Sequence, residues 1–152
     1  APLPCQYTNL CAVCHAQLRI MKVRYPKPGI VYKGAIPVAE IALNTSDKYL
    51  AILISALLGN AYKFTQEGTI SLECDRLGDD RVFIAVTDTG CGIPPEKHGY
   101  VFERFTKLDT FSQGNGLGLY LCRLIVTHLH GEIYIDSGYT GGTRIVAILP
   151  RR

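Results

Sequence analysis

The spacing of apolar residues predicts three helices along the chain. Residues 9–21 place a set of apolar residues on one side, namely Leu10, Val13, Leu18 and Met21. A second helix is predicted to begin after Ser46, a residue type that caps helix N-termini, with Asp47 favourable in its first turn. It runs to about Phe64 and is apolar nearly all round until Leu58, which indicates a buried helix.

The third predicted helix covers residues 117–130. Its inward positions are predicted to be Leu121, Leu124, Ile125 and Leu129. Gly131 follows directly and is predicted to close the helix as its C-cap.

Strand-like stretches fill much of the remaining chain. The predicted strands are residues 5–8, 29–32, 40–43, 69–74, 81–88, 132–137 and 143–149. Residues 69–74 alternate, so that Ile70, Leu72 and Cys74 share one face, whereas the run Val82–Val86 is continuously apolar and predicts burial on both faces. The order of elements predicts a two-layer α/β (α+β) sandwich, with one mixed, mostly antiparallel sheet and helices on a single face.

Composition and charge narrow the class of protein. The chain has 152 residues, 47% of them hydrophobic and 19% charged, which fits one globular domain. A net charge of +3 without a long basic run gives no indication of nucleic-acid binding. No apolar stretch is long enough to span a bilayer, no signal peptide is visible, and the absence of an initiator Met fits an excised fragment.

Six cysteines raise the question of metal or redox chemistry. Cys11 and Cys14, followed by His15, have the spacing of half a zinc site, but no second ligand pair stands at matching spacing. They also do not follow a strand of a βαβ unit, as a thioredoxin-like motif does. We expect reduced, buried or half-buried thiols, with metal or redox chemistry as the open alternative.

Asn60 and Lys63 stand three residues apart near the end of the second predicted helix, so they share a face. An amide oxygen is a suitable ligand for Mg²⁺, and a lysine meets phosphate as a point charge. The alternative is a helix end that frays into solvent.

The segment Asp88-Thr89-Gly90-Cys91-Gly92 ends a predicted buried strand. A carboxylate there can accept a hydrogen bond from the exocyclic amine of a base, and glycines let the backbone approach a ligand closely. The alternative is an ordinary Asp-capped turn.

Residues 89–116 contain several glycines and two prolines and show little periodicity, which is typical of a functional or mobile loop. At its end, Gly114–Leu119 opens a helix, and glycines there expose backbone N–H groups to phosphate. Leu119 breaks the dinucleotide-binding fingerprint, and no strand directly precedes it. Within the loop, Phe102 and Phe105 either latch it to the core or form a small cluster of their own.

Together, the order and spacing of these features resemble the histidine kinase ATP-binding domain, a member of the Bergerat-fold ATPases. The matching segments are residues 56–65 (N box), 88–94 (G1 box, with Glu96 after it), 102–105 (F box), 114–119 (G2 box) and 141–143 before the last strand. The resemblance covers about residues 5–150.

The resemblance implies roles for individual residues. Asn60 would ligate Mg²⁺ and Lys63 would touch a phosphate; with Lys107, which would face the γ-phosphate, they form the implied catalytic set. The other implied nucleotide-binding residues are Phe64, Asp88, Gly90, Gly92, Ile93, Gly116, Leu117, Gly118 and Thr143. Asp88 would accept from the adenine amino group with Thr143 nearby, and residues of about 94–115 would form a short ATP lid, as in some hybrid two-component kinases.

Two positions depart from the family pattern. Ala56 stands four residues before Asn60, where the family usually has a polar residue, and this bears on catalytic rate more than on nucleotide binding. Asn115 replaces the threonine often found in the G2 box.

The function implied is ATP- and Mg²⁺-dependent transfer of a phosphoryl group to a histidine on a separate dimerisation and phosphotransfer domain, for relay to a response regulator receiver domain. Residues 1–152 would be one catalytic domain, monomeric in isolation and cytoplasmic, from a homodimeric parent that is compatible with membrane anchoring. One alternative is a nucleotide-binding pseudokinase, which Ala56 supports. A gyrase- or chaperone-type ATPase ranks last, because it requires Glu where Ala56 stands.

Overall fold

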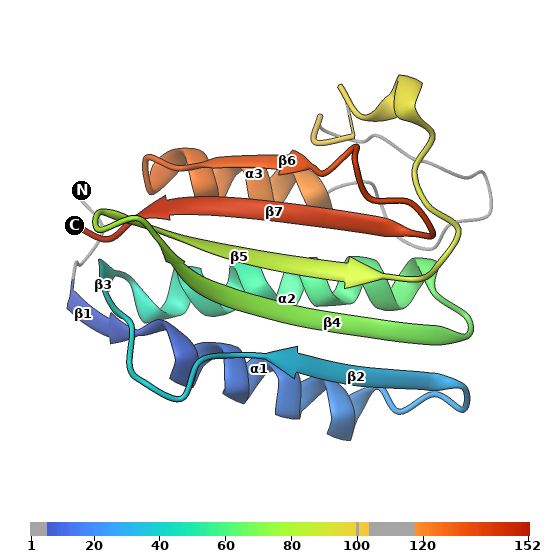
Figure 1. Cartoon of the computed structure of the whole chain (residues 1–152), viewed down its shortest axis with the longest axis horizontal. Helices are drawn as coiled ribbons and strands as arrows, with labels where there is room; N and C mark the ends of the chain where they lie inside the picture. Colours follow the sequence, from blue (N-terminus) through green and yellow to red (C-terminus); the bar gives the residue numbers. More distant parts are fainter. Residues whose placement is uncertain (1–5, 100, 104–117) are drawn as a thin grey trace.

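The structure is a computed structural model that describes residues 6–99, 101–103 and 118–152 (Figure 1). In chain order its elements are β1 (Gln6–Asn9), α1 (Leu10–Arg24), β2 (Ile30–Ala35), β3 (Ala42–Thr45), α2 (Asp47–Phe64), β4 (Gly68–Leu77), β5 (Arg81–Asp88), the short 3-10 helix η1 (Pro95–Lys97), α3 (Gly118–His128), β6 (Glu132–Ile135) and β7 (Thr143–Pro150).

Five strands form one mixed sheet in the order β2-β4-β5-β7-β6. Strand β2 pairs parallel to β4, and the other neighbours pair antiparallel. Helices α1, α2 and α3 lie together on one face of this sheet (Figure 1). The predicted two-layer sandwich is therefore confirmed, but β1 and β3 form a separate antiparallel pair instead of joining the sheet.

Helix α2 lies at the centre of the core. Its fully buried residues are Leu50, Leu53, Ile54, Leu57 and Leu58. They pack against the inward residues of β4 and β5, among them Ile70, Leu72 and Ile84. The predicted cap is also confirmed, since the Ser46 hydroxyl accepts from the backbone N–H of Tyr49.

The predicted inward face of α3 is partly wrong. Leu121 and Leu124 are 40% and 47% exposed, whereas Leu119, Cys122, Ile125 and Val126 are the buried residues. The helix carries apolar residues on more than one side, so its periodicity alone did not select the face that packs against α2 and the sheet.

The end of α3 also differs from the prediction. His130, not Gly131, has the left-handed backbone, with φ of 63°. His130 N–H donates to Thr127 O at 3.0 Å and Gly131 N–H donates to Val126 O at 2.8 Å, which is the Schellman pattern. Glycine at 131 is required by contact, because a Cβ there would collide with the carbonyl oxygen of Ile148.

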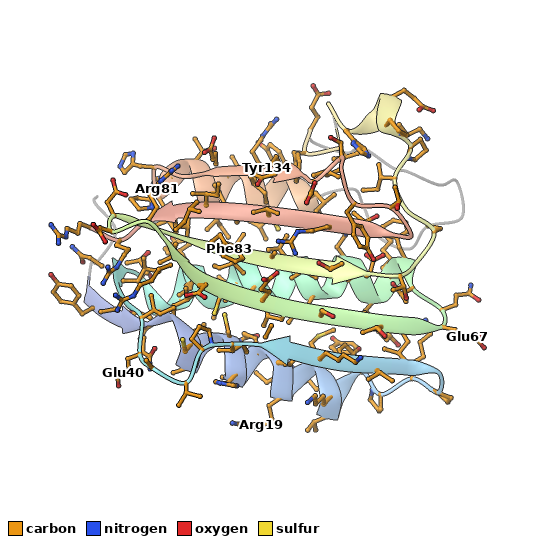
Figure 2. All side chains as sticks on the ribbon, in the orientation of Figure 1. Arg19, Glu40, Glu67, Arg81, Phe83 and Tyr134 are labelled. Carbon is orange, nitrogen blue, oxygen red and sulfur yellow. The ribbon has the colours of Figure 1, made fainter. Side chains whose placement is uncertain are left out.

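The second face of β5 is not fully buried, contrary to the prediction. Phe83 and Thr87 are half-buried, because they lie on the face of the sheet that the three helices do not cover (Figure 2). Polar contacts cross the strands here instead: Arg144 Nη1 lies 2.9 Å from Glu73 Oε1, and its Nε lies 3.3 Å from Asp136 Oδ2.

Strand boundaries shift by a few residues from their predicted positions. Strand β4 continues to Leu77, β2 covers Ile30–Ala35, and β3 begins only at Ala42.

Within the described ranges, no helix combines the length and hydropathy needed to cross a bilayer.

Three cysteines of α1 and β4 meet inside the core. Cys11, Cys14 and Cys74 are buried, whereas His15 is exposed, so the histidine does not face the thiols. Burial raises the pKa of Cys11 to about 11, and a hydrogen bond with Cys14 together with burial raises the pKa of Cys74. All three thiols belong to the hydrophobic core cluster, where they pack against apolar side chains.

Candidate functional site

Asp88 is the last residue of β5, and its carboxylate is buried at 3% exposure. Its Oδ1 accepts two backbone hydrogen bonds, from Gly90 N–H at 2.9 Å and from Thr143 N–H at 3.2 Å. Burial raises the pKa of the Asp88 carboxyl, and these two donors oppose the rise. Because both bonds use Oδ1, neither occupies Oδ2.

Thr143 lies beside Asp88 because the antiparallel register of β5 and β7 makes the two residues Cα partners. The predicted proximity of these residues, 55 positions apart in sequence, is therefore present in the fold. Tyr139 adds a contact that sequence analysis missed, since its hydroxyl donates to the Asp88 carbonyl oxygen at 3.2 Å. No local sequence signal marks Tyr139, because its partner comes from another hairpin.

The segment Asp88–Gly92, hereafter the G1 turn, packs against the C-terminal end of α2. Cys91 N–H approaches the carbonyl oxygen of Phe64 at 3.4 Å. A Cβ on Gly90 would collide with this same carbonyl group, and Gly92 has φ of 76°, where glycine is favoured. The backbone geometry of the G1 turn thus favours glycine at both positions, independently of the ligand role that the resemblance implies.

Asn60, Lys63 and Phe64 occupy the last turn and a half of α2, next to the G1 turn. Asn60 is half-buried and Lys63 is exposed, with its Nζ 5.4 Å from the centre of the Phe64 ring. An amide oxygen suits Mg²⁺, and an exposed lysine ammonium suits phosphate. Ala56, one turn earlier, packs against the core.

Lys27 is a further neighbour of this helix end that sequence analysis did not single out. Its Nζ donates to the Thr65 carbonyl oxygen at 3.0 Å and lies 4.8 Å above the Tyr62 ring. Lys27 therefore fixes the residues that follow α2 from the side of the β2 edge.

A pocket of about 530 Å³ opens on the other side of the G1 turn. It is lined by Gly90–Pro95, His98, Ile135–Ser137 and Tyr139–Thr143. Ile93, Gly92 and Thr143 face this space, whereas Asn60 and Lys63 do not line it. The G1 turn consequently stands between this pocket and the end of α2.

The remaining predicted site residues are placed only in part. Gly118 is exposed and begins α3, as predicted for the G2 box. Phe102 is buried at 8% exposure within the core cluster, which confirms that this part of the F box latches to the core. Lys107, Gly116, Leu117, Asn115 and Phe105 lie outside the described residues, as does most of the predicted lid.

Among the described residues, no group of three His, Cys, Asp or Glu side chains could hold a metal ion. Such a group is not required for a Mg²⁺ ion that enters with a phosphate ligand, because Mg²⁺ is commonly held by few protein groups and by substrate phosphates.

A two-layer sandwich with a buried aspartate, a glycine turn and a polar helix end in contact defines a nucleotide-binding domain of the Bergerat type. Comparison with known proteins agrees: residues 45–152 match the family described as histidine kinase-, DNA gyrase B-, and HSP90-like ATPase. The chain belongs to this family, as a histidine kinase ATP-binding catalytic domain.

Two relatives and one solved structure illustrate the similarity. The chain is 32% identical over 155 residues to the adaptive-response sensory kinase SasA of Gloeothece citriformis (strain PCC 7424), covering 99% of this chain and 39% of that protein. It is 37% identical over 129 residues to hybrid signal transduction histidine kinase K of Dictyostelium discoideum, covering 74% and 11%. The mycobacterial sensor histidine kinase MprB structure shares the fold, with a TM-score of 0.84 and 24% identity over 97% of this chain and 98% of that one.

The chain therefore spans well under half the length of these two relatives.

Proposed function

We propose that the chain binds Mg·ATP and donates its γ-phosphoryl group to a histidine on a separate dimerisation and phosphotransfer domain. The observation that carries this proposal is the contact between the G1 turn and the end of α2, where Cys91 N–H meets Phe64 O. The contact joins the end of β5, which carries the proposed base acceptor Asp88, to the end of α2, which carries the proposed phosphate-binding residue Lys63.

Asp88 would hold the adenine. Its Oδ1 is engaged by two backbone donors, so Oδ2 is the acceptor for the adenine amino group. Thr143 would contribute its hydroxyl beside that amine, and Phe64, Ile93, Gly90 and Gly92 would line the base.

Asn60 would ligate Mg²⁺ and Lys63 would meet a phosphate, since both extend from the accessible end of α2. Lys107 and the backbone of Gly116, Leu117 and Gly118 would complete the phosphate end. ATP supplies the phosphoryl group when bound, and Mg²⁺ neutralises its charge. The chain contributes position and electrostatic stabilisation, which are the main sources of catalysis in phosphoryl transfer.

The acceptor domain and the receiver domain of a response regulator are the proposed partners. The relative named a hybrid signal transduction histidine kinase fits such an arrangement. We further propose that residues 1–152 form a single catalytic domain that is monomeric alone and cytoplasmic. Its parent protein is proposed to be a homodimer, and membrane anchoring of that parent is compatible with this role.

A nucleotide-binding pseudokinase is the second candidate. Its support is Ala56, which carries no polar group and packs against the core one turn before Asn60. The similarity to sensor histidine kinases favours the active form. Single-turnover transfer to a supplied acceptor domain separates the two, because a pseudokinase binds ATP and transfers nothing.

The central experiment uses γ-labelled ATP with the chain alone and with the dimerisation domain of its parent protein. We expect acid-labile label on the added domain only. None of His15, His98, His128 and His130 is followed by the acidic residue that the family's acceptor histidine usually has. Acid-labile label on the isolated chain would overturn the proposal that the acceptor histidine lies on a separate domain.

The metal role is tested by titrating Asn60→Ala with ATP in the presence and absence of Mg²⁺. The wild type should bind more tightly with Mg²⁺, and the variant should lose most of that difference while its thermal melting is unchanged. Ser55→Ala, on the exposed side of the same helix, is the matched control. An Mg²⁺ dependence that survives in Asn60→Ala would exclude Asn60 as the ligand.

A further inference from the structure

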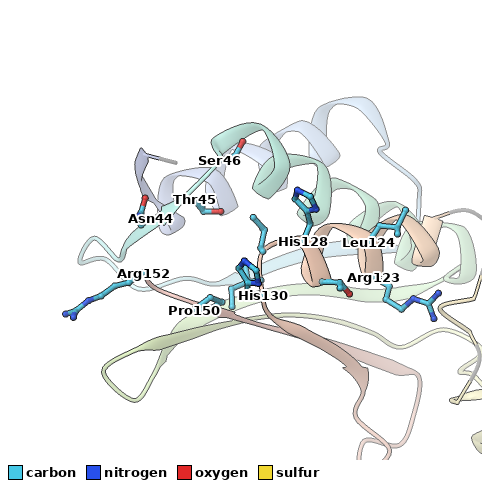
Figure 3. Close-up of a pocket in the computed structure, with 12 residues that line it drawn as sticks. Asn44, Thr45, Ser46, Arg123, Leu124, His128, His130, Pro150 and Arg152 are labelled. Atoms are coloured by element: carbon cyan, nitrogen blue, oxygen red, sulfur yellow. The ribbon is translucent and has the colours of Figure 1, made fainter. Parts of the chain in front are cut away.

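A second pocket lies at the opposite end of α2 from the G1 turn. It has a volume of about 930 Å³ and is formed where β3 leads into α2, where α3 ends, and by the last residues of the chain (Figure 3). Its lining residues are Asn44, Thr45, Ser46, Arg123, Leu124, Thr127, His128, Leu129, His130, Leu149, Pro150 and Arg152. The 18 residues of α2, at about 1.5 Å per residue, place the Phe64 end of the helix about 27 Å from its Ser46 end, where this pocket lies.

Thr45 provides an unsatisfied hydrogen-bonding group in this pocket. The residue is 5% exposed, and its Oγ1 is a buried atom without a hydrogen-bond partner in the described structure. Figure 3 shows its hydroxyl turned toward the α3 side of the pocket. A buried hydroxyl without a partner is costly, so a ligand that accepts its hydrogen bond is favoured there.

The two lining residues whose side chains carry a fixed charge are both arginines. Arg123 and Arg152 lie on opposite sides of the pocket with their guanidinium groups directed outward at its rim, and His128 and His130 lie between them (Figure 3). Among the described residues that line the pocket, none is acidic. The neighbouring carboxylate, Asp47, accepts a hydrogen bond from the Thr8 hydroxyl and does not line the space. With arginines at the rim and no acidic side chain in the lining, a negative ligand is favoured over a positive one here.

The floor of the pocket is apolar. Leu124, Leu129, Leu149 and Pro150 contribute to it, and Leu124 is 47% exposed. A concave space with an apolar floor and a few convergent polar groups is typical of small-molecule sites, which range over roughly 300–1,000 Å³.

We propose that this pocket, hereafter the α2–α3 pocket, binds a small anion with an apolar body. The Thr45 hydroxyl and the histidines hold the anionic head, and the leucines contact the body. The site is separate from the nucleotide site and does not depend on the proposed kinase activity.

Octanoate is a suitable probe, with octanol as its uncharged equivalent. In ¹H–¹⁵N NMR titrations of the whole chain, with ADP present to fill any nucleotide site, octanoate should shift the amides of residues 44–46, 123–130 and 149. We expect octanoate to bind about tenfold more tightly than octanol, as one charge-assisted hydrogen bond implies. Shifts elsewhere only, or equal affinity for octanol, would overturn the proposal.

Substitutions in the pocket test which side chains contact the carboxylate of octanoate. Thr45→Val keeps the side-chain shape and should weaken octanoate binding several-fold to about tenfold while leaving octanol binding unchanged. His128→Gln combined with His130→Asn should have a similar effect, and Asn tolerates the left-handed backbone at position 130. Arg19→Gln removes an exposed charge from α1, far from this pocket, and should change neither affinity. Equal weakening by Arg19→Gln would indicate non-specific attraction and refute the site.

A bilayer of anionic lipids also presents negative head groups on apolar chains. A sedimentation assay with phosphatidylglycerol vesicles therefore distinguishes a free small anion from a membrane surface as the ligand. We expect octanoate binding without co-sedimentation. Capture by vesicles, without pocket shifts from octanoate, would replace the proposed free ligand with a membrane surface.

Discussion

The middle of α2 and the junction at its C-terminal end are held together in different ways. In the middle, Leu53, Leu57 and Leu58 are fully buried and fill the space between the other helices and the sheet. At the junction, backbone groups meet directly, as Cys91 N–H approaches Phe64 O and Gly90 leaves no room for a Cβ. The middle stabilises the fold, whereas the junction positions polar groups for a ligand, so substitutions in the two regions should affect different properties.

The largest expected effect is a loss of stability from the middle of the helix. Leu57→Ala should lower the free energy of unfolding by about 2–5 kcal/mol, because it removes a fully buried side chain and leaves a cavity. Urea denaturation measures this, and ADP affinity measured under folding conditions should be unchanged. Ser55→Ala, exposed on the same helix, should change little. A large loss of ADP affinity in a folded Leu57→Ala protein would show that the two regions are not separable.

Two glycines sharpen the comparison because the same substitution should have opposite effects. Gly90→Ala should destabilise the protein by about 1–3 kcal/mol and weaken ADP binding, since its Cβ would push the G1 turn away from Phe64 O. Gly59→Ala, on α2 with open space around it, should stabilise by up to about 1 kcal/mol through helix propensity. Thermal unfolding of both variants checks the signs, and stabilisation by Gly90→Ala would contradict the close contact.

Asp88→Asn should separate binding from stability. Asn retains an acceptor oxygen for the Gly90 and Thr143 N–H groups but places an N–H₂ group where the adenine amine needs an acceptor. ADP affinity should therefore fall about ten- to a hundredfold, the range for one buried charge-assisted hydrogen bond. Calorimetry measures the affinity, and unchanged binding by a folded variant would remove Asp88 from the site.

The smallest expected effect is a pH dependence of stability. The folded-state pKa of Asp88 is raised by burial, so the folded protein holds this proton more tightly than the unfolded chain does. The resulting stabilisation is present below the unfolded-state pKa of about 4 and is lost as pH rises through the folded-state value.

Asp88→Asn, which cannot lose a proton, should consequently become more stable relative to the wild type as pH rises from about 4 to 7. Urea denaturation at both pH values tests this, with Asp79→Asn in an exposed turn as the control. A difference that is constant with pH, or that has the opposite sign, would show that burial does not govern the Asp88 carboxyl.

Local sequence determined the elements that carry the site. Ser46 and the apolar run after it predicted α2 up to Phe64, and β5 was predicted to end at Asp88, as observed. The order of the boxes then placed the polar residues at the ends of these elements. Such features are readable because capping and periodicity depend on residues within one or two turns of each other.

The tertiary structure decided which residues of distant segments become neighbours. The register of β5 and β7 brings Thr143 to Asp88, and the Tyr139 hydroxyl reaches the Asp88 carbonyl oxygen from 51 positions away. Packing also selected the buried side of α3 and left Leu124 exposed beside the α2–α3 pocket, although the leucines of this helix look alike in the sequence. A helix with apolar residues on more than one side has no single preferred face, so the neighbours that cover it decide which side is buried.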